Sequence, residues 1–341
     1  MHTVIVGSGI AGISFAEELR KRSPETAVTL VSRETDGYYS RPLLSHAFTR
    51  ADIETRIVLR TFDDLAQSAG IEVLSGTEAL ALDARAQTLA CEKDGKALHL
   101  DYDKLILAQG SDAFVPPPFR AQANLFHVLN SLTDLKALRH LRDEHRSRVA
   151  QVRWAVVGGG LIGCEISADL AGSGDQVSLF HALPRLMERQ LVEEDSAELL
   201  RLLTEHYRID VRLNCAVQGF SGQPGALTVG VDEKLESGFH GIILACGFKP
   251  RIELAASAGL DTGRGIRVDG ALKTSNPNIH AIGDVAELPD GKLYAYVTPV
   301  RSQAIWLARY LTGSDEASWQ PPAFKPKAKI PGFNAKHDYL F

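Results

Sequence analysis

The chain has 341 residues, of which 45% are hydrophobic and 23% are charged, values typical of a soluble globular protein. Its formal net charge of −5 argues against a nucleic-acid-binding protein, which normally carries a basic excess. No apolar run approaches the roughly 20 residues that span a bilayer. The first motif begins at Val4, which leaves no room for a signal peptide. The four cysteines are Cys91, Cys164, Cys215 and Cys246. They stand too far apart in the sequence for a CxxC pair or a compact thiolate metal site. Their small number predicts that the protein is located in the reducing cytoplasm.

The first segment, "HTVIVGSGIAGISFAEELRKR", predicts a buried strand, a tight turn and a helix. Gly7, Gly9 and Gly12 occupy the positions of the GxGxxG pattern. In that pattern the first glycine permits the turn, the second lets a pyrophosphate approach the backbone, and the third lets the helix pack on the strand. The next predicted strand, "AVTLVS", is followed by Glu34, whose carboxylate can hold a ribose hydroxyl. The segment therefore predicts a dinucleotide-binding unit.

Apolar and polar residues alternate over residues 79–102, on both sides of Lys93, Asp94 and Gly95. This alternation around a turn sequence predicts a β-hairpin.

A second unit of the same design begins at "RWAVVGGGLIGCE". Gly158, Gly160 and Gly163 take the three glycine positions, and "QVSLF" predicts the following strand. His181 stands where the first unit has its acid, so the ribose of this second dinucleotide is held differently or less firmly. Two dinucleotides suggest a relay in which one delivers a hydride and leaves, while a flavin stays and releases single electrons.

Five stretches together resemble the two-dinucleotide-binding-domain flavoproteins, the pyridine nucleotide–disulfide oxidoreductase superfamily. They are "VIVGSGIAG", "DKLILAQGS", "VVGGGLIGCE", "IILACGFKPRIEL" and "KTSNPNIHAIGDVAEL". The resemblance implies an α/β fold with two Rossmann-like domains, one for FAD and one for NAD(P). It also implies that Gly283 and Asp284 meet the FAD phosphate and ribitol.

Within that superfamily, "YYSRPLLSH" (residues 38–46) resembles the rubredoxin and ferredoxin reductase branch. Arg41 and Pro42 would lie against the flavin, and Glu165 would lie near the flavin edge where the nicotinamide stacks. A lysine of the C-terminal segment would reach the FAD, and Lys327 matches best by spacing, although Lys325 and Lys329 compete with it.

The expected FAD-binding residues are Gly7, Gly9, Ile10, Ala11, Gly12, Glu34, Arg41, Pro42, Ala79, Ala108, Gly110, Glu165, Gly283, Asp284, Val297 and Lys327. The expected NAD(P)-binding residues are Gly158, Gly160, Leu161, Ile162, Gly163, His181 and Gly247.

The order of the motifs predicts a discontinuous FAD domain with the NAD(P) domain inserted into it. The expected ranges are 1–112 and 246–320 for FAD, 113–245 for NAD(P), and 321–341 for an extended C-terminal tail. A helix is expected to end near Leu311, and the 30 residues after it are too few for the packed third domain that relatives carry.

The cysteine positions decide between reaction classes of the superfamily. Thiol-dependent members need a cysteine in the segment occupied here by "YYSRPLLSH", which has none. The resemblance therefore implies an NAD(P)H-dependent reductase that uses the flavin and no catalytic side chain. The flavin would accept a hydride from NADH and pass the two electrons one at a time to a small one-electron carrier protein. Rubredoxin is the first expected carrier, followed by a ferredoxin or a flavorubredoxin. No metal site, no nucleic-acid partner and no membrane span are expected.

Two alternatives stay open at this point. One is an NADH-dependent quinone or small-oxidant reductase, and the other is a redox-sensing flavoprotein of the apoptosis-inducing-factor type. NADH is expected in preference to NADPH, although Arg185 could serve a 2′-phosphate.

Overall fold

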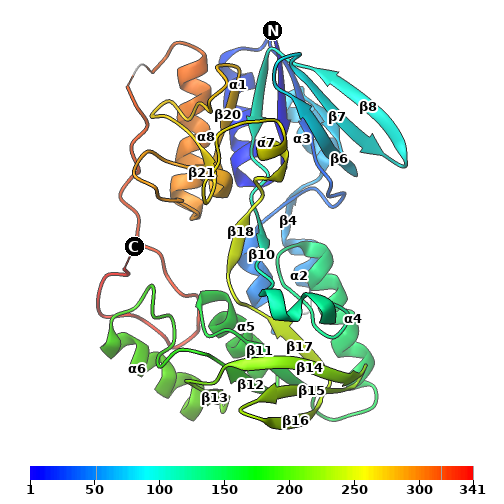
Figure 1. Cartoon of the computed structure of the whole chain (residues 1–341), viewed down its shortest axis with the longest axis vertical. Coiled ribbons are helices and arrows are strands. Elements are labelled where there is room, and N and C mark those ends of the chain that lie inside the picture. Colours follow the sequence, from blue (N-terminus) through cyan, green and yellow to red (C-terminus); the bar gives the residue numbers. More distant parts are fainter. Residues whose placement is uncertain (51, 316, 341) are drawn as a thin grey trace. The chain divides into compact units, whose positions relative to one another are not determined.

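The computed structural model describes residues 1–50, 52–315 and 317–340 (Figure 1). The chain divides into two compact units. The first unit comprises residues 1–39, 58–112 and 250–324, and the second comprises residues 40–57, 113–249 and 325–341. The chain changes unit after Tyr39, Ile57, Asp112, Lys249 and Phe324.

The first unit is built on a five-stranded parallel sheet with the order β20-β9-β1-β2-β5. Its strands are β1 (His2–Val6), β2 (Ala27–Val31), β5 (Glu72–Leu74), β9 (Lys104–Leu107) and β20 (Ile279–Ala281). Val4 and Ile5 are fully buried, as expected for a central parallel strand covered on both faces. Helix α1 (Ile10–Arg22) packs against α8 (Val297–Leu311), and α8 ends at the residue expected from the sequence.

The predicted hairpin is present and is part of a three-stranded antiparallel sheet. Its turn is made by Asp94 and Gly95, both at positive φ, as a tight two-residue hairpin turn requires. The strands are β6 (Thr77–Asp83), β7 (Thr88–Lys93) and β8 (Lys96–Asp101).

The remaining elements of the first unit are short. They are β3 (Tyr38–Tyr39), β4 (Val58–Arg60), α3 (Phe62–Ala69), α7 (Glu253–Ser257), β19 (Ile266–Arg267), η4 (Gly283–Val285) and β21 (Ala286–Glu287). Strands β10 (Ser111–Ala113) and β18 (Phe248–Pro250) each contain one of the points at which the chain changes unit.

The second unit is built on a four-stranded parallel sheet with the order β13-β12-β11-β17. Its strands are β11 (Arg153–Val157), β12 (Gln176–Phe180), β13 (Asp210–Arg212) and β17 (Gly241–Leu244). An antiparallel sheet accompanies it, made of β14 (Val217–Gln223), β15 (Ala226–Val231) and β16 (Lys234–Phe239). Its helices are η1 (Arg41–His46), α2 (Ile53–Arg56), η2 (Pro117–Gln122), α4 (Leu132–Arg146), α5 (Leu161–Gly172), α6 (Glu193–Arg201) and the π-helical turn η3 (Leu202–His206).

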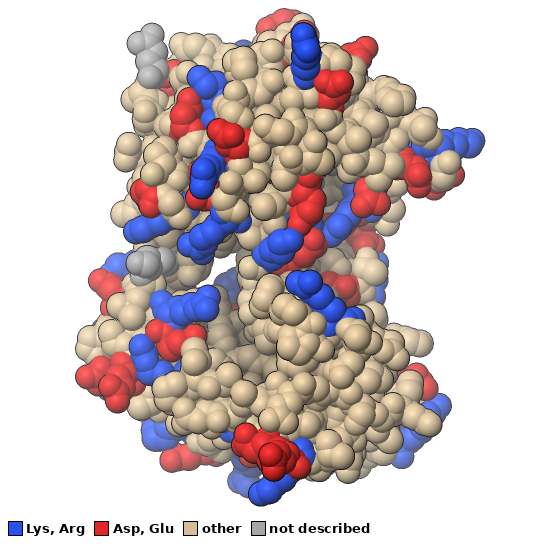
Figure 2. Space-filling view, viewed as in Figure 1, with Lys and Arg blue, Asp and Glu red and all other residues tan. Residues whose placement is uncertain are grey.

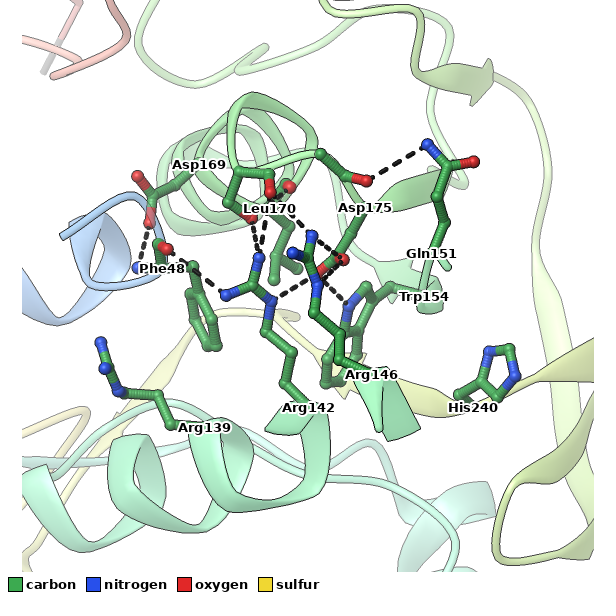
Figure 3. Close-up of polar contacts among 12 residues, drawn as sticks. Phe48, Arg139, Arg142, Arg146, Gln151, Trp154, Asp169, Leu170, Asp175 and His240 are labelled. Atoms are coloured by element: carbon green, nitrogen blue, oxygen red, sulfur yellow. Dashed lines mark hydrogen bonds and ion pairs between the residues drawn. The ribbon is translucent and has the colours of Figure 1, made fainter. Parts of the chain in front are cut away.

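Residues 40–57 belong to the second unit, whereas the sequence places them in the FAD domain. A buried carboxylate on α5 is one of the groups that hold this segment. Asp169 accepts a hydrogen bond from the backbone N–H of Phe48 at 2.6 Å (Figure 3). It also accepts one from the hydroxyl of Thr49 at 2.5 Å. Arg139 on α4 adds donors to two backbone carbonyl groups of the same segment. A sequence pattern does not reveal such pairs, because their partners lie about 120 positions apart.

A second buried carboxylate fixes α4 to the sheet of this unit. Asp175, whose side chain is fully buried, accepts hydrogen bonds from Arg142 Nε (2.6 Å) and from Trp154 Nε1 (3.1 Å) (Figure 3). Arg146 binds the other carboxylate oxygen. A buried charge is tolerated when it is paired and hydrogen-bonded, as this one is.

Residues 325–340 run without a helix or strand and dock on the second unit. Asp195, at the start of α6, accepts the backbone N–H groups of Lys336 (2.9 Å) and His337 (3.0 Å). Tyr207 donates its hydroxyl to the carbonyl of Pro331 at 2.8 Å. The segment starts four positions later than the expected tail, because residues 321–324 group with the first unit.

No helix in the described parts of the chain is both long enough and apolar enough to cross a lipid bilayer.

Candidate nucleotide-binding sites

The carboxyl edge of the first unit's parallel sheet collects residues that the sequence assigns to FAD. Gly7 follows β1, Ala108 follows β9, Gly283 follows β20, and Glu34 comes shortly after β2. These four strands are neighbours and run in the same direction, so the residues after them share one edge. Open α/β sheets bind their ligands outside that edge.

The glycines of the first turn are required for different reasons. Gly7 has φ +116° and lies against the backbone of Ala108, so a side chain there is strained and also blocked. A Cβ on Gly12 would collide with the carbonyl oxygen of Gly7. Gly9 has ordinary backbone angles (φ −74°, ψ −177°), and a Cβ there would meet no protein atom within 4 Å. Because neither backbone nor packing demands glycine at position 9, the open space in front of α1 fits a bound pyrophosphate.

The Gly-Asp pair is held by two side chains that the sequence analysis missed. Gln303, fully buried on α8, accepts the backbone N–H of Gly283 at 2.7 Å. Ser111 donates its hydroxyl to Asp284 at 2.9 Å. The sequence signal for Gln303 was a glutamine on an otherwise apolar helix face.

Two buried polar atoms, Gln303 Nε2 and Gln109 Oε1, have no hydrogen-bond partner in the described structure. Buried polar atoms are normally paired, so this fits a site completed by a polar ligand.

Glu34 is held in place at the sheet edge. Tyr39 donates its hydroxyl to the Glu34 carboxylate at 3.1 Å, and the Glu34 backbone N–H donates to Ser32 Oγ at 3.1 Å. Ser32 in turn contacts Ser8 of the glycine turn, with 2.7 Å between the two hydroxyl oxygens. The backbone of Glu34 is therefore linked to the glycine turn through Ser32 and Ser8.

The other expected FAD residues of the first unit occupy separate elements. Gly110 has φ +70° and a Cβ there would meet no protein atom within 4 Å. Ala79 lies on β6 opposite Cys91, and Val297 is the first residue of α8, with 47% of its surface exposed. Their contact with FAD stays a prediction.

The second glycine turn repeats this geometry in the second unit. Gly158 has φ +113° and donates its N–H to Phe180 O at 2.8 Å. Gly160 begins α5 with φ −77° and ψ −173°, and a Cβ there would meet no protein atom within 4 Å. Gly163 packs on Gly158, as Gly12 packs on Gly7. Leu161 and Ile162 form the first turn of α5, and Gly247 follows β17 at φ +107°.

His181 follows β12 at the same sheet edge but is buried and fully engaged within the chain. Its Nδ1 accepts the backbone N–H of Gly159 at 2.9 Å. Its Nε2 lies 3.0 Å from Arg185 O and 3.2 Å from a Glu188 carboxylate oxygen. The ring therefore joins the glycine turn to the loop that follows β12, and its expected contact with the nucleotide stays a prediction.

Glu165, expected at the flavin edge, is a buried carboxylate on α5. Ser45 donates its hydroxyl to Oε2 at 2.6 Å, the N–H of Lys329 donates to Oε1 at 2.8 Å, and His46 Nε2 lies 3.5 Å from Oε2. Burial raises the pKa of this carboxyl. The neighbouring His46, Ser45 and Lys329 groups outweigh burial and hold the pKa below its usual value.

The other residues assigned to the flavin by resemblance also lie in the second unit. Arg41 donates from Nη1 to Asn130 O at 2.5 Å, and Pro42 is in the first turn of η1. Lys327 is exposed on the C-terminal segment, while Lys325 pairs with Asp338 at 2.7 Å. Their contact with the flavin stays a prediction.

The described cysteines are free thiols and are poorly suited to redox chemistry. Burial raises the pKa of Cys91 and of Cys246 to about 11, and it raises the pKa of Cys164 and of Cys215 as well. A raised pKa disfavours the reactive thiolate. Cys215 lies between β13 and β14, and Cys246 lies between β17 and β18, so both are outside the strands. The described residues contain no group of three or more His, Cys, Asp or Glu placed to hold a metal ion.

Comparison with known proteins gives consistent results. Residues 1–304 match the family described as Pyridine nucleotide-disulphide oxidoreductase. The chain is 32% identical over 313 residues to rubredoxin-NAD(+) reductase of Alcanivorax borkumensis, covering 91% of this chain and 78% of the relative. It is 31% identical over 330 residues to the nitric oxide reductase FlRd-NAD(+) reductase of Escherichia coli, covering 96% and 83%. The solved covalent complex of putidaredoxin reductase with putidaredoxin matches with a TM-score of 0.85 and 29% identity, covering 97% of this chain and 79% of that chain.

Proposed function

Because the chain belongs to the pyridine nucleotide-disulphide oxidoreductase family, we propose that it is an FAD-dependent reductase. It takes electrons from NADH and passes them to a small one-electron carrier protein, with rubredoxin as the first candidate. The observation that carries this proposal is the pair of glycine turns at the carboxyl edges of two parallel sheets. In both turns the glycine before the helix leaves its side-chain space open.

The first unit supplies the groups that would hold FAD. The N–H groups at the start of α1 would face the pyrophosphate, Glu34 would accept a ribose hydroxyl, and Asp284 would lie near the ribitol. Bound FAD would supply the ability to accept a hydride and to release single electrons. The protein's task is to bind and orient both cofactors.

The second unit supplies the groups that would hold NADH. The start of α5 would bind the pyrophosphate, and Gly160 would leave room for it. Glu165 lies in the first turns of the same helix, with its carboxylate fixed by Ser45 and the Lys329 N–H. A fixed carboxylate at this position can orient a polar group of the nicotinamide.

A protein acceptor is supported by the relatives and by the thiols. The curated relatives are named for rubredoxin and FlRd, and the solved relative is a complex with putidaredoxin. The described thiols have raised pKa values and are unsuited to carry electrons onward. Lys and Arg are interspersed with Asp and Glu over the face drawn in Figure 2, so charge alone does not mark one docking patch there. The cytoplasm, where NADH is supplied, stays the predicted compartment.

The test is stopped-flow reduction of the purified, FAD-loaded protein, followed by steady-state turnover with a chosen acceptor. NADH should bleach the flavin absorbance, and oxidised rubredoxin should then sustain turnover. If the protein reduces a quinone but none of the carrier proteins, it is a quinone reductase and the proposal is wrong. Slow bleaching followed by a long-lived complex with NAD would replace it by a redox sensor.

A further inference from the structure

The loop after β12 closes over the second glycine turn. A Cβ on Gly159 would lie 2.6 Å from a Leu186 side-chain carbon and 2.8 Å from the His181 ring. The Gly159 carbonyl accepts the N–H of Met187 at 2.9 Å. This loop, residues 181–191, is therefore packed on the turn that is expected to bind the nucleotide pyrophosphate.

The hydrogen bonds of His181 define the tautomer of its neutral ring. Because Nδ1 accepts the Gly159 N–H, the proton of the neutral ring is on Nε2. That N–H is directed to Arg185 O and to the Glu188 carboxylate. His181 therefore bridges the glycine turn and the Glu188 carboxylate, and both of its ring nitrogens are engaged within the chain.

Arg185, the candidate partner of a 2′-phosphate, is also engaged. Its Nη1 donates to Leu191 O at 2.5 Å and its Nη2 donates to Glu188 O at 3.0 Å. Binding a phosphate would require breaking two charge-assisted hydrogen bonds that fold the loop. This arrangement works against NADPH.

Glu188 is the acid held at this edge of the sheet. Its side chain is 22% exposed, with one carboxylate oxygen near His181 and the other 3.8 Å from Arg189 Nε. The side chain of Arg189 is 85% exposed, so its ion pair with Glu188 is weak. A ligand can therefore displace Arg189 from this carboxylate at a small cost in free energy. A ribose acid normally stands directly after the second strand. Here the ring of His181 occupies that place, and the carboxylate lies beyond it.

We propose that Glu188, positioned by His181, accepts the adenosine ribose hydroxyls of NADH and repels the 2′-phosphate of NADPH. The inference rests on the proposed NADH site and names its specificity-determining residue. A carboxylate next to a phosphate dianion is electrostatically unfavourable. This repulsion selects NADH over NADPH more strongly than one hydrogen bond to a ribose hydroxyl could alone.

The test is calorimetric binding of ADP-ribose and 2′-phospho-ADP-ribose to the FAD-loaded protein, which needs no turnover. The wild type should favour ADP-ribose. Glu188→Gln should weaken ADP-ribose and tighten 2′-phospho-ADP-ribose, changing their affinity ratio by about tenfold or more, the effect expected of a charged hydrogen bond. Glu144→Gln, at an exposed glutamate of α4 that pairs with Arg148, is the matched control and should leave the ratio unchanged.

The outcomes separate this inference from the proposed function. Equal weakening of both ligands in Glu188→Gln, with a lowered Tm, would mean that Glu188 only folds the loop and would overturn the inference. If the affinity ratio of the two ligands changes in Arg189→Ala but not in Glu188→Gln, the inference is overturned and Arg189 determines the specificity. If the wild-type protein binds neither ligand, or if NADH does not reduce its flavin, the proposed function is overturned and this inference falls with it.

Discussion

Glu165 accepts the backbone N–H of Lys329 at 2.8 Å, so one buried carboxylate ties the helix of the second glycine turn to the C-terminal segment. The two residues are 164 positions apart. This contact makes the stability of the docked segment depend on the charge of Glu165.

Glu165→Gln should lower the free energy of unfolding of the second unit at neutral pH by about 1.5–3 kcal/mol, the usual contribution of hydrogen bonds to a charged group. The pKa of Glu165 is lowered in the folded protein, so its ionised form stabilises the fold above the unfolded-state pKa of about 4.3. That stabilisation is lost as the pH falls through the lower folded value. Thermal unfolding of wild type and variant should therefore differ at pH 7 and converge in acid. A difference in Tm that is constant across this range would contradict the prediction.

Gly9→Val should give folded but colourless protein. A Cβ at this position meets no protein atom within 4 Å, yet a valine side chain would fill the space in front of α1 that FAD pyrophosphate would need. Flavin content after purification and the far-UV circular dichroism spectrum measure the two effects separately. Gly12→Val is the contrast, because its Cβ collides with Gly7 and should impair folding itself. Normal flavin content in Gly9→Val would refute the assignment of the first turn.

Gly160→Val should keep FAD and lose NADH. The substitution leaves the first unit untouched and blocks only the start of α5. Flavin reduction at a fixed, subsaturating NADH concentration should slow by about a hundredfold, equivalent to roughly 2.7 kcal/mol of lost binding. Chemical reduction of the same flavin with dithionite is the control and should be unaffected. A variant reduced by NADH at the wild-type rate would show that the nucleotide binds elsewhere.

Lys327→Glu should raise KM for an acidic carrier by about threefold to tenfold at low ionic strength, with a smaller effect as salt rises. Lys327 is exposed, whereas Lys325 is already paired with Asp338. The control Lys96→Glu changes the charge equally on the β8 hairpin of the first unit. Flavin occupancy is measured alongside, because the resemblance assigns Lys327 to FAD. An unchanged KM at low salt, with full occupancy, would exclude both roles.

The parts of the fold that the sequence predicted are those specified by short-range patterns. The glycine turns, their strands and the hairpin at Asp94 and Gly95 follow from backbone requirements within a few residues. The grouping of residues 40–57 with the second unit depended on Asp169, and the support of Gly283 depended on Gln303. Such buried polar pairs are set by the final packing, which no local periodicity records.

The candidate sites divide in the same way. Gly7, Gly158 and the residues after each strand lie where the pattern places them. His181 lies where expected but contacts the protein, because the Gly159 N–H and the Glu188 carboxylate are close enough to engage both ring nitrogens. The role of a titratable side chain depends on such neighbours, and the motif specifies only its position.

The run Gly158–Gly159–Gly160 has a consequence for mutational scanning. A Cβ at position 158 clashes with Ala245, and one at position 159 clashes with the loop residues Leu186 and His181. A Cβ at position 160 meets no protein atom within 4 Å. A selection for soluble, folded protein should therefore reject substitutions at the first two positions and accept them at the third. A selection for cell growth that depends on the reductase should reject all three. Comparing the two selections would map the ligand-facing backbone without a bound nucleotide.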